Sequence, residues 1–361
     1  MSSAPASTSP GSGPRPEASR HRGALVAWAL LLAYASLYPF LPIRLPGEDA
    51  PALFLRPKFI SEFDVFMNVA AYVPFGALAC LHFMPGRARW SARWRAVLLA
   101  AALSLAMELA QFFIATRVAS LFDVLANAAG AFAGTLLFFR PLERAVMAPV
   151  ARLRDRLVVP GGAGDMGLVL VLFWLLAQLN PALPFFEAGN IVDETGPTMA
   201  DFVVTTVSVA LSVAAFGLFV SVLLRAERGA LGWTLILLTV ALWCKFAMAS
   251  LMLKPNLTAM WMTEGRVAGL VAGLALFLPL RLLGRTARTY LATLCLLAGS
   301  LFAKIFGEYS ELADFLRLFQ WPHGQLASFA TLTRWLHESW PALTLAWLIV
   351  RFVRRPGESI Q

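Results

Sequence analysis

Seven polar side chains between residues 64 and 127 fall at helical spacings inside apolar sequence. They form three pairs and one single cation: Asp64 with Asn68, Glu108 with Gln111, Arg117, and Asp123 with Asn127. Because residues three or four positions apart lie on one face of a helix, each pair presents a carboxylate and an amide together. Three carboxylates, three amides and one guanidinium can bind a polar ligand, compensate its charge or carry a proton.

Glu108 is the most informative of these residues because it lies within a long apolar run. An ionised carboxylate in hydrocarbon is costly unless it is paired, hydrated or protonated. Arg117 follows after a short turn and is its natural partner. Two interpretations stay open: the cluster is a functional site, or it ties three helices together through satisfied hydrogen bonds.

The elements that carry these residues are predicted to be transmembrane helices. Hydrophobic residues make up 59% of the 361 residues and charged residues only 14%, with a mean hydropathy of +0.69. Apolar runs of spanning length recur ten times, at about 24–41, 66–84, 95–114, 121–139, 166–187, 203–224, 231–252, 265–283, 288–306 and 337–353. The sequence therefore predicts an all-α, polytopic bundle of about ten spans with no large water-soluble domain.

Arginine is concentrated in every second connection between these runs, beginning with the N-terminal segment. By the positive-inside rule both termini are cytoplasmic, and all seven polar residues lie toward the outer leaflet. The net charge of +9 then reflects a basic inner face, whose expected partners are anionic membrane lipids and not nucleic acid. An alternative start is cleavage after Ala33-Tyr34-Ala35, which would remove the first span and leave the other orientations unchanged.

The predicted organisation has four parts. Residues 1–22, rich in Ser, Pro and Gly, form a disordered cytoplasmic tail. A four-helix transmembrane unit follows at 23–145, then a basic cytoplasmic linker at 146–164. A six-helix unit occupies 165–355 and includes an amphipathic helix near 308–321, which is expected to lie on the outer surface.

Short sequence similarities link the two transmembrane units. Leu37–Pro42 resembles Leu179–Pro184, and the small-residue segment 129–134 resembles 268–273. Gly130 and Gly134, like Gly269 and Gly273, would allow close helix packing. Four spans separate the matching segments, so a duplication would give parallel four-helix repeats, with chance similarity as the alternative. The second unit has Lys245 in place of a carboxylate and Arg266 near the position of Asn127.

Common catalytic motifs are missing from the sequence. Its histidines show no paired-ligand spacing, its three cysteines lie singly in apolar runs, and it contains no P-loop or GxSxG motif. We therefore expect no metal site and no cofactor, and we expect a binding or transport protein more than an enzyme. Lys245 and Lys304 are the other deep cations, and each either pairs with a carboxylate or extends toward the interface.

The order of polar residues resembles the VanZ-like family of bacterial membrane proteins over about residues 25–140. The pattern that carries the resemblance is Asp64-x3-Asn68-x3-Tyr72-x-Pro74-x-Gly76, Glu108-x2-Gln111, Arg117 and Asp123-x3-Asn127-x2-Gly130-x3-Gly134. That family is named for an accessory protein of glycopeptide-resistance clusters that gives low-level teicoplanin resistance. The resemblance implies a multi-pass protein of the bacterial cytoplasmic membrane with a role in the cell envelope.

Three functions are consistent with the sequence. The leading hypothesis is an outward-facing site that binds a membrane lipid, a cell-wall precursor or a lipoglycopeptide and so affects teicoplanin sensitivity. In it, Arg117 contacts an anionic headgroup, and the seven residues form the site. The alternatives are a proton-coupled transporter in which Glu108 titrates, and a hydrolase or transferase that uses Glu108 or Asp123 as a base, with a divalent ion held by the carboxylates.

Overall fold

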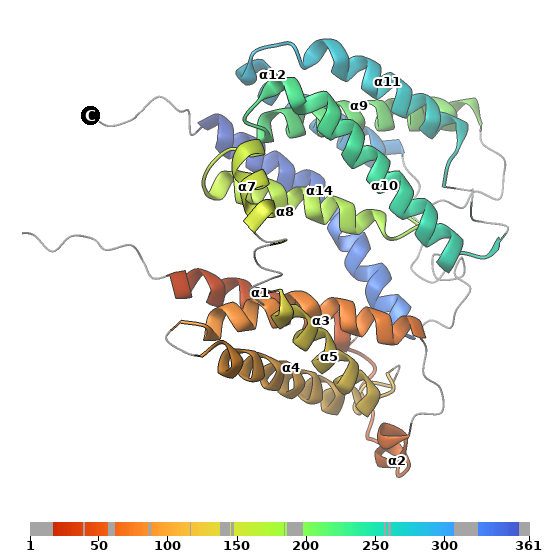
Figure 1. Cartoon of the computed structure of the whole chain (residues 1–361). Helices are drawn as coiled ribbons and strands as arrows, with labels where there is room; N and C mark the ends of the chain where they lie inside the picture. The colour runs from red at the N-terminus through yellow and green to blue at the C-terminus, as the bar shows by residue number, and fades with distance from the viewer. Residues whose placement is uncertain are drawn as a thin grey trace, which may run out of the picture. The chain divides into compact units, whose positions relative to one another are not determined.

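A computed structural model shows a helical protein whose chain divides into two compact units, Met1–Met147 and Ala148–Gln361 (Figure 1). The structure describes residues 17–38, 40–56, 62–85, 88–115, 117–137, 145, 148–183, 185, 198–255, 258, 261–306 and 324–353. Within these residues the regular structure is helical, and strand-like pairing is limited to two isolated bridges. The predicted all-α class is confirmed.

The described part of the first unit contains four long helices and one short one. These are α1 (Glu17–Leu37), α2 (Ala50–Leu55), α3 (Glu62–Phe83), α4 (Arg89–Gln111) and α5 (Leu121–Leu136). The start of α5 is determined locally, since the Ser120 hydroxyl accepts a hydrogen bond from the Phe122 N–H at 3.1 Å. The segment after α1 then pairs with the turn after α4: the Arg44 N–H donates to the Phe113 carbonyl at 2.8 Å.

Close packing of α3 against α5 forms the centre of the first unit. A Cβ atom added at Gly134 would lie 2.0 Å from the Val73 carbonyl oxygen, and one added at Gly130 would lie 2.2 Å from the Val69 oxygen. Such distances leave no room for any side chain. Glycine at these two positions therefore allows backbone contact between the helices, as small-residue stripes do in membrane bundles.

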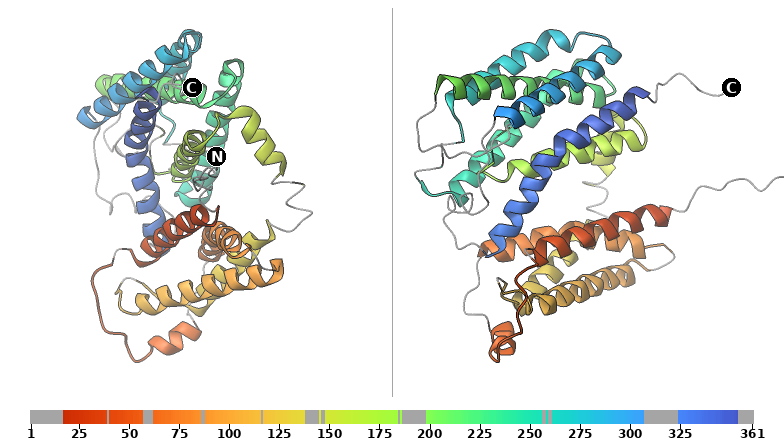
Figure 2. Two further views of the ribbon diagram at one scale, coloured as in Figure 1. Left: turned by 90° about the vertical axis from the view of Figure 1, so that its left-hand side faces the viewer. Right: turned by 180° about the vertical axis from the view of Figure 1, so that it is seen from behind.

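The second unit contains seven described α-helices and a 3-10 turn. They are α7 (Ala148–Leu157), α8 (Gly162–Gln178), α9 (Met199–Leu223), η2 (Glu227–Gly229), α10 (Ala230–Met252), α11 (Glu264–Leu280), α12 (Arg285–Phe306) and α14 (Gly324–Val353). Thr198 and Asp201 form a reciprocal capping box at the start of α9. Helix α9 packs against both α11 and α12, while α8 packs against α14 (Figure 2).

The pairing of α3 with α5 recurs within the second unit as the pairing of α9 with α11. A Cβ at Gly269 would lie 2.6 Å from Val209 Cβ, and one at Gly273 would lie 2.6 Å from the Ala210 carbonyl oxygen. The two glycine-rich segments that resemble each other in sequence therefore make the same kind of contact, one with α3 and the other with α9. Packing differs around the first helix of each set, because α1 packs on α3 whereas α8 packs mainly on α14.

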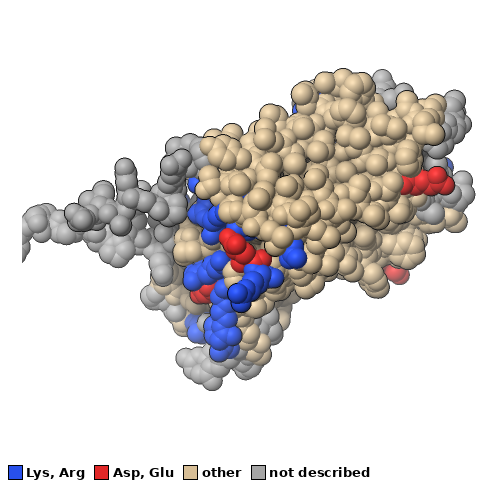
Figure 3. Space-filling view, turned by 90° about the horizontal axis from the view of Figure 1, so that it is seen from above, with Lys and Arg blue, Asp and Glu red and all other residues tan. Residues whose placement is uncertain are grey.

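The exposed side chains of these helices are mainly apolar, as expected for surfaces that face lipid. Leu30, Phe66 and Leu98 are each about two-thirds exposed. On the face drawn in Figure 3, Lys and Arg side chains gather at one end, and most of the remaining surface carries no charge. The protein is a membrane protein by this composition and by its helix lengths.

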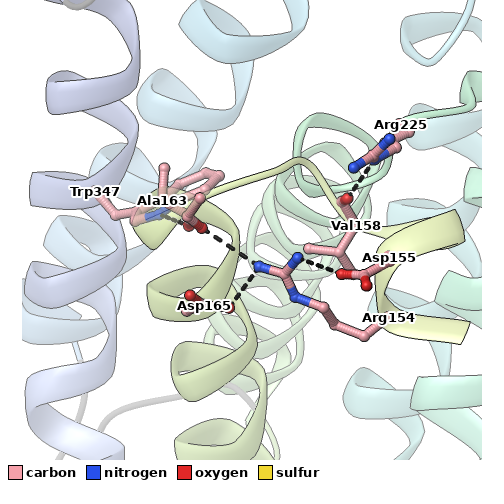
Figure 4. A network of polar contacts seen from close by, with 8 residues as sticks. Arg154, Asp155, Val158, Ala163, Asp165, Arg225 and Trp347 are labelled. Carbon is pink, nitrogen blue, oxygen red and sulfur yellow. Dashed lines mark hydrogen bonds and ion pairs between the residues drawn. The ribbon is translucent and has the colours of Figure 1, made fainter. Parts of the chain in front are cut away.

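Polar contacts connect α7 and α8 with the end of α9. The Val159 N–H donates to the Leu223 carbonyl at 3.0 Å, and Arg225 Nε donates to the Val158 carbonyl at 2.8 Å. Arg154 forms ion pairs with Asp155 at 2.8 Å and Asp165 at 2.5 Å (Figure 4). These contacts fix the C-terminal end of α9 within the second unit.

Each of the ten predicted apolar runs overlaps a described α-helix, although the run 166–187 continues beyond the end of α8. Within the described ranges, five helices are long and apolar enough to cross a membrane: Asp64–Phe83, Arg89–Gln111, Met199–Leu223, Glu227–Met252 and Arg285–Phe306. Ala24–Leu37, Leu121–Leu136 and Gly162–Gln178 are shorter apolar helices. The predicted count of about ten spans is not confirmed, because five of the described helices have the length and composition of a membrane span.

Some boundaries differ from the sequence prediction. Helix α1 begins at Glu17, inside the predicted tail, because the segment from Glu17 to Arg22 contains good helix formers and no proline. The predicted linker 146–164 contains α7, whose polar sequence forms a helix despite its low hydropathy. Residues 1–16 of the predicted tail and the predicted interfacial helix near 308–321 lie outside the described residues.

Candidate functional site

The predicted polar residues come from four neighbouring parts of the first unit. Asp64 and Asn68 lie in the first turns of α3, Glu108 and Gln111 in the last turns of α4, and Asp123 and Asn127 in the first turns of α5, with Arg117 in the connection before α5. Helix α3 packs against α4 and α5, and α4 also packs against α5. We call these seven residues, together with the residues that lie against them, the polar cluster. The additional residues are Ser36 and the C-terminal end of α1, Tyr72, Ser104 and Ser120.

Glu108 is buried, with 3% of its surface exposed. Its Oε2 atom accepts a hydrogen bond at 2.8 Å from the backbone N–H of Ser120, the residue that caps α5. A carboxylate at this position is favoured by the free N–H groups and the positive dipole end of the helix. Glu108 therefore links the end of α4 to the start of α5.

Arg117 connects this region to α1. Its Nε donates to the Tyr38 carbonyl at 3.0 Å, and one terminal nitrogen donates to the carbonyls of Tyr38 at 2.8 Å and Ala35 at 3.1 Å. These are free carbonyls at a helix C-terminus, where a cation is favourable. Burial lowers the pKa of Arg117, while the nearby carboxylates of Glu108, Asp64 and Asp123 act in the opposite direction.

Two amides of the polar cluster form hydrogen bonds between helices. Gln111 Nε2 donates to the Ser36 carbonyl at 2.9 Å and to its hydroxyl at 2.8 Å. Asn127 Nδ2 donates to the Ser104 hydroxyl at 2.8 Å. Gln111 therefore joins α4 to α1, and Asn127 joins α5 to α4. Part of the cluster clearly stabilises the helix arrangement, as one of the two sequence interpretations proposed.

Three buried polar atoms of the same cluster have no hydrogen-bond partner among the residues that the structure describes. They are Asn68 Nδ2, the Tyr72 hydroxyl and Asn127 Oδ1. Asn68 lies beside Asp123, and the Tyr72 hydroxyl lies beside Ser104 and Glu108, but neither reaches hydrogen-bonding geometry. Because an unsatisfied buried polar group is costly, these two donors and one acceptor indicate a place that a polar ligand or water would fill.

Sequence reasoning missed several members of this cluster. Tyr72 is part of the family-like pattern and lies one helical turn after Asn68, but it was not predicted as a site residue. Ser104 lies one turn before Glu108, so the helical spacing that joined Glu108 to Gln111 could have found it. Ser36 and Ser120 gave no comparable signal, because one contributes through a helix end and the other through its backbone N–H.

The carboxylates of the polar cluster are not arranged as a metal site. Among the described residues, which include Asp64, Glu108 and Asp123, no three His, Cys, Asp or Glu side chains are grouped closely enough to hold an ion. The arrangement instead brings three carboxylates near one guanidinium. This set of groups can hold a polar headgroup or a proton, with hydrogen bonds from the amides and the phenol.

The second unit contains a related contact with different residues. Lys245 on α10 is fully buried, and its Nζ donates to the Asn180 carbonyl at 3.1 Å. Asn180 precedes a proline after α8, as Tyr38, the acceptor of Arg117, precedes a proline after α1. Val73 and Ala210 occupy equivalent positions, because Gly134 packs against one and Gly273 against the other. Lys245 follows Glu108 by the same number of residues as Ala210 follows Val73. These features support the predicted repeat, in which the second copy has a cation at the place of Glu108.

Arg266 is also buried, and residues just before α11 hold it in place. One terminal nitrogen donates to the Trp261 carbonyl at 3.2 Å, while its backbone N–H approaches the Thr263 hydroxyl at 3.4 Å. A narrow recess beside it, without room for a water molecule, is lined mainly by apolar side chains such as Phe185 and Leu270. Lys304, the remaining deep cation of the sequence prediction, lies in the last turn of α12.

Comparison with known proteins identifies the first unit. Residues 17–143 match the family model described as VanZ/LLP1. No curated protein and no solved structure matches the chain. The matched range contains all of the polar cluster and extends over the four long helices of the first unit.

Proposed function

Because residues 17–143 belong to the VanZ-like family of membrane proteins, we propose that their polar cluster is a binding site for the headgroup of an envelope lipid or a cell-wall-related molecule. The site opens toward the outer leaflet of the bacterial cytoplasmic membrane, in agreement with the arginine distribution. By binding such a molecule, the protein would change sensitivity to teicoplanin-type glycopeptides.

The observation that carries this proposal is the set of three unsatisfied polar atoms on Asn68, Tyr72 and Asn127. A cluster that served only to connect helices would satisfy its own hydrogen bonds, as Gln111 does with both of its contacts to Ser36. The two free donors and one free acceptor instead suit a hydroxyl or amide group, which can both accept and donate.

The charges of the cluster narrow the ligand class. Three carboxylates lie near the single guanidinium of Arg117, so the cluster is net acidic when all of them are ionised. A headgroup with hydroxyl groups or an amine is therefore favoured over a strongly anionic one. Arg117 donates to two carbonyls of α1, so we assign it to holding that helix and balancing the carboxylates more than to contacting an anion.

One observation favours a second function. Glu108 is almost completely buried within an apolar helix, where its Oε2 accepts a hydrogen bond from the Ser120 backbone N–H. Intramembrane carboxylates of this kind serve as proton carriers in transporters. Proton-coupled transport would require that Glu108→Gln abolish pH-dependent flux, which can be measured in proteoliposomes with an imposed pH gradient.

The binding function is tested in a deletion strain of the source bacterium. The strain is complemented with wild type, Glu108→Gln, Asp123→Asn or the control Asp165→Asn, each at the same membrane abundance, and teicoplanin sensitivity is measured. Glutamine keeps an acceptor for the Ser120 N–H, and Asp165 is an exposed carboxylate of the second unit. We expect the control to complement and the two cluster variants to fail.

If both cluster variants restore wild-type sensitivity at equal abundance, the proposal is wrong and the cluster only packs helices. If the control also fails, sensitivity does not report on the polar cluster, and the binding proposal loses this support. Direct detection of the bound molecule then decides the question.

A further inference from the structure

A second group of charged side chains lies far from the polar cluster in sequence, at the C-terminal end of α9. Its members come from α12, α14 and the turn after α9: Arg285, Arg288, Arg351 and Glu227. Helix α12 packs against both α9 and α14, so these residues belong to one part of the second unit. We call them the arginine group.

Two of the arginines satisfy the end of α9. Arg288 donates to the Ser221 carbonyl at 3.3 Å, and Arg285 donates to the Val222 carbonyl. The next carbonyl, that of Leu223, accepts from the Val159 N–H. The last carbonyls of the helix are therefore occupied, and capping accounts for one donor group of each arginine.

Capping leaves much of the group's hydrogen-bonding capacity unused. Each guanidinium has five N–H donors. Arg288 also pairs with Glu227. Its Nε has no hydrogen-bond partner among the described residues, and water cannot supply one because the whole side chain is buried. Arg351 makes a cation–π contact with Trp347, at 5.8 Å from its ring centroid. Among the described contacts, Arg285 and Arg351 have no carboxylate partner of their own.

The charges of the group are also unbalanced. Arg351 and Arg288 lie close enough to Arg285 to disfavour its positive charge, and Glu227 lies close enough to favour it. The arginine group therefore contains three guanidiniums and one carboxylate, and the side chain of that carboxylate is 57% exposed. Grouping like charges at a partly buried position is unfavourable unless an anion compensates them.

The side chains around this group are of the kind found at lipid-binding sites. Leu282 and Leu283 precede Arg285 and are exposed, and Ile349 and Val350 precede Arg351 and are also exposed. Basic and apolar side chains next to each other match a phosphate headgroup with its acyl chains. In the sequence-derived topology this end faces the cytoplasm, where anionic lipids act on basic residues.

We infer that the arginine group is a specific site for an anionic phospholipid, with the phosphodiester between Arg285 and Arg351. Arg288 forms the buried floor of the site and keeps Glu227 in an ion pair. This inference concerns the second unit and does not depend on the function proposed for the polar cluster.

The test measures retention of phosphatidylglycerol and phosphatidylcholine by the full chain, using native mass spectrometry in mild detergent. Wild type should retain phosphatidylglycerol about tenfold better than phosphatidylcholine, and Arg351→Gln should remove most of that preference. Arg228→Gln is the matched control, because it removes the same charge from an exposed residue in the turn after α9. It should stay within about twofold of wild type.

A gain-of-binding variant protects the test against loss of fold. Glu227→Gln removes the only carboxylate of the group but keeps an oxygen acceptor for Arg288, so it should increase phosphatidylglycerol retention severalfold. Equal retention of the two lipids by wild type would overturn the inference. Equal losses in Arg351→Gln and Arg228→Gln would also overturn it, because they would show a diffuse charge effect. Displacement of the lipid by millimolar inorganic phosphate would contradict a lipid site and indicate a free-phosphate site.

Discussion

Replacing Tyr72 with phenylalanine separates a ligand site from a packing cluster. The side chain is 3% exposed, its ring contacts Phe75 at a centroid distance of 5.8 Å, and its hydroxyl has no hydrogen-bond partner in the described part of the chain. Phenylalanine keeps the ring and removes only the hydroxyl. Without ligand, the change therefore removes an unsatisfied buried polar group and costs no hydrogen bond within the protein.

The expected magnitudes follow from this geometry. Leaving a buried hydroxyl unsatisfied costs about 1–3 kcal/mol, so Tyr72→Phe should raise the free energy of unfolding by about 1 kcal/mol or leave it unchanged. If the hydroxyl contacts the ligand, its loss should weaken binding by about 1 kcal/mol, or roughly fivefold. The variant is thus expected to be as stable as wild type and to function less well.

Thermal unfolding in lipid-depleted detergent and complementation at equal abundance are the two assays. Tyr34→Phe is the control, because Tyr34 lies in α1 with 38% of its surface exposed and should change stability by less than about 0.5 kcal/mol. A loss of more than about 1 kcal/mol in Tyr72→Phe would refute the reasoning, since it would show that the hydroxyl has a partner in the protein. Full function of this variant would equally count against a ligand contact.

Three further predictions concern helix packing and hydrogen bonds. Gly134→Ala should destabilise the protein by about 3 kcal/mol, because its Cβ would lie 2.0 Å from a carbonyl oxygen, whereas Gly232→Ala, with open space around it, should be neutral or stabilising; thermal unfolding compares them. Glu108→Ala should cost about 1–3 kcal/mol more than Glu108→Gln, because only glutamine offers an acceptor to the Ser120 N–H; equal unfolding temperatures would contradict this. Arg117→Lys should cost about 1–2 kcal/mol, because an ammonium cannot reproduce the three bonds to α1 carbonyls; unchanged stability would oppose the capping role.

The helices and the polar faces of the first unit could be predicted from the sequence. Long apolar runs predict helices because a helix satisfies its backbone hydrogen bonds internally within a membrane. Helical spacing placed Glu108 with Gln111, and Asp123 with Asn127, on shared helix faces. The short small-residue similarities between the halves likewise indicated glycine contacts, which the structure shows on α3 and α9. These features depend on local periodicity, which the sequence records directly.

Contacts between distant helices could not be predicted in this way. Arg117 was expected to face a ligand, but most of its described bonds go to carbonyls at the end of α1, some eighty residues earlier. The sequence does not show which helix end lies beside a cation, since this depends on packing. The unsatisfied atoms of Tyr72 and Asn127 likewise become visible only when every neighbouring donor and acceptor is known.

The most direct test of the central claim is to identify what occupies the polar cluster. Wild type, Tyr72→Phe and Tyr34→Phe are purified from native membranes at equal yield, and their bound small molecules are compared by native mass spectrometry. The account predicts a species with a hydroxyl- or amine-bearing headgroup that is retained by wild type and Tyr34→Phe and is several times less abundant on Tyr72→Phe. Identical bound species in equal amounts on all three proteins would contradict it.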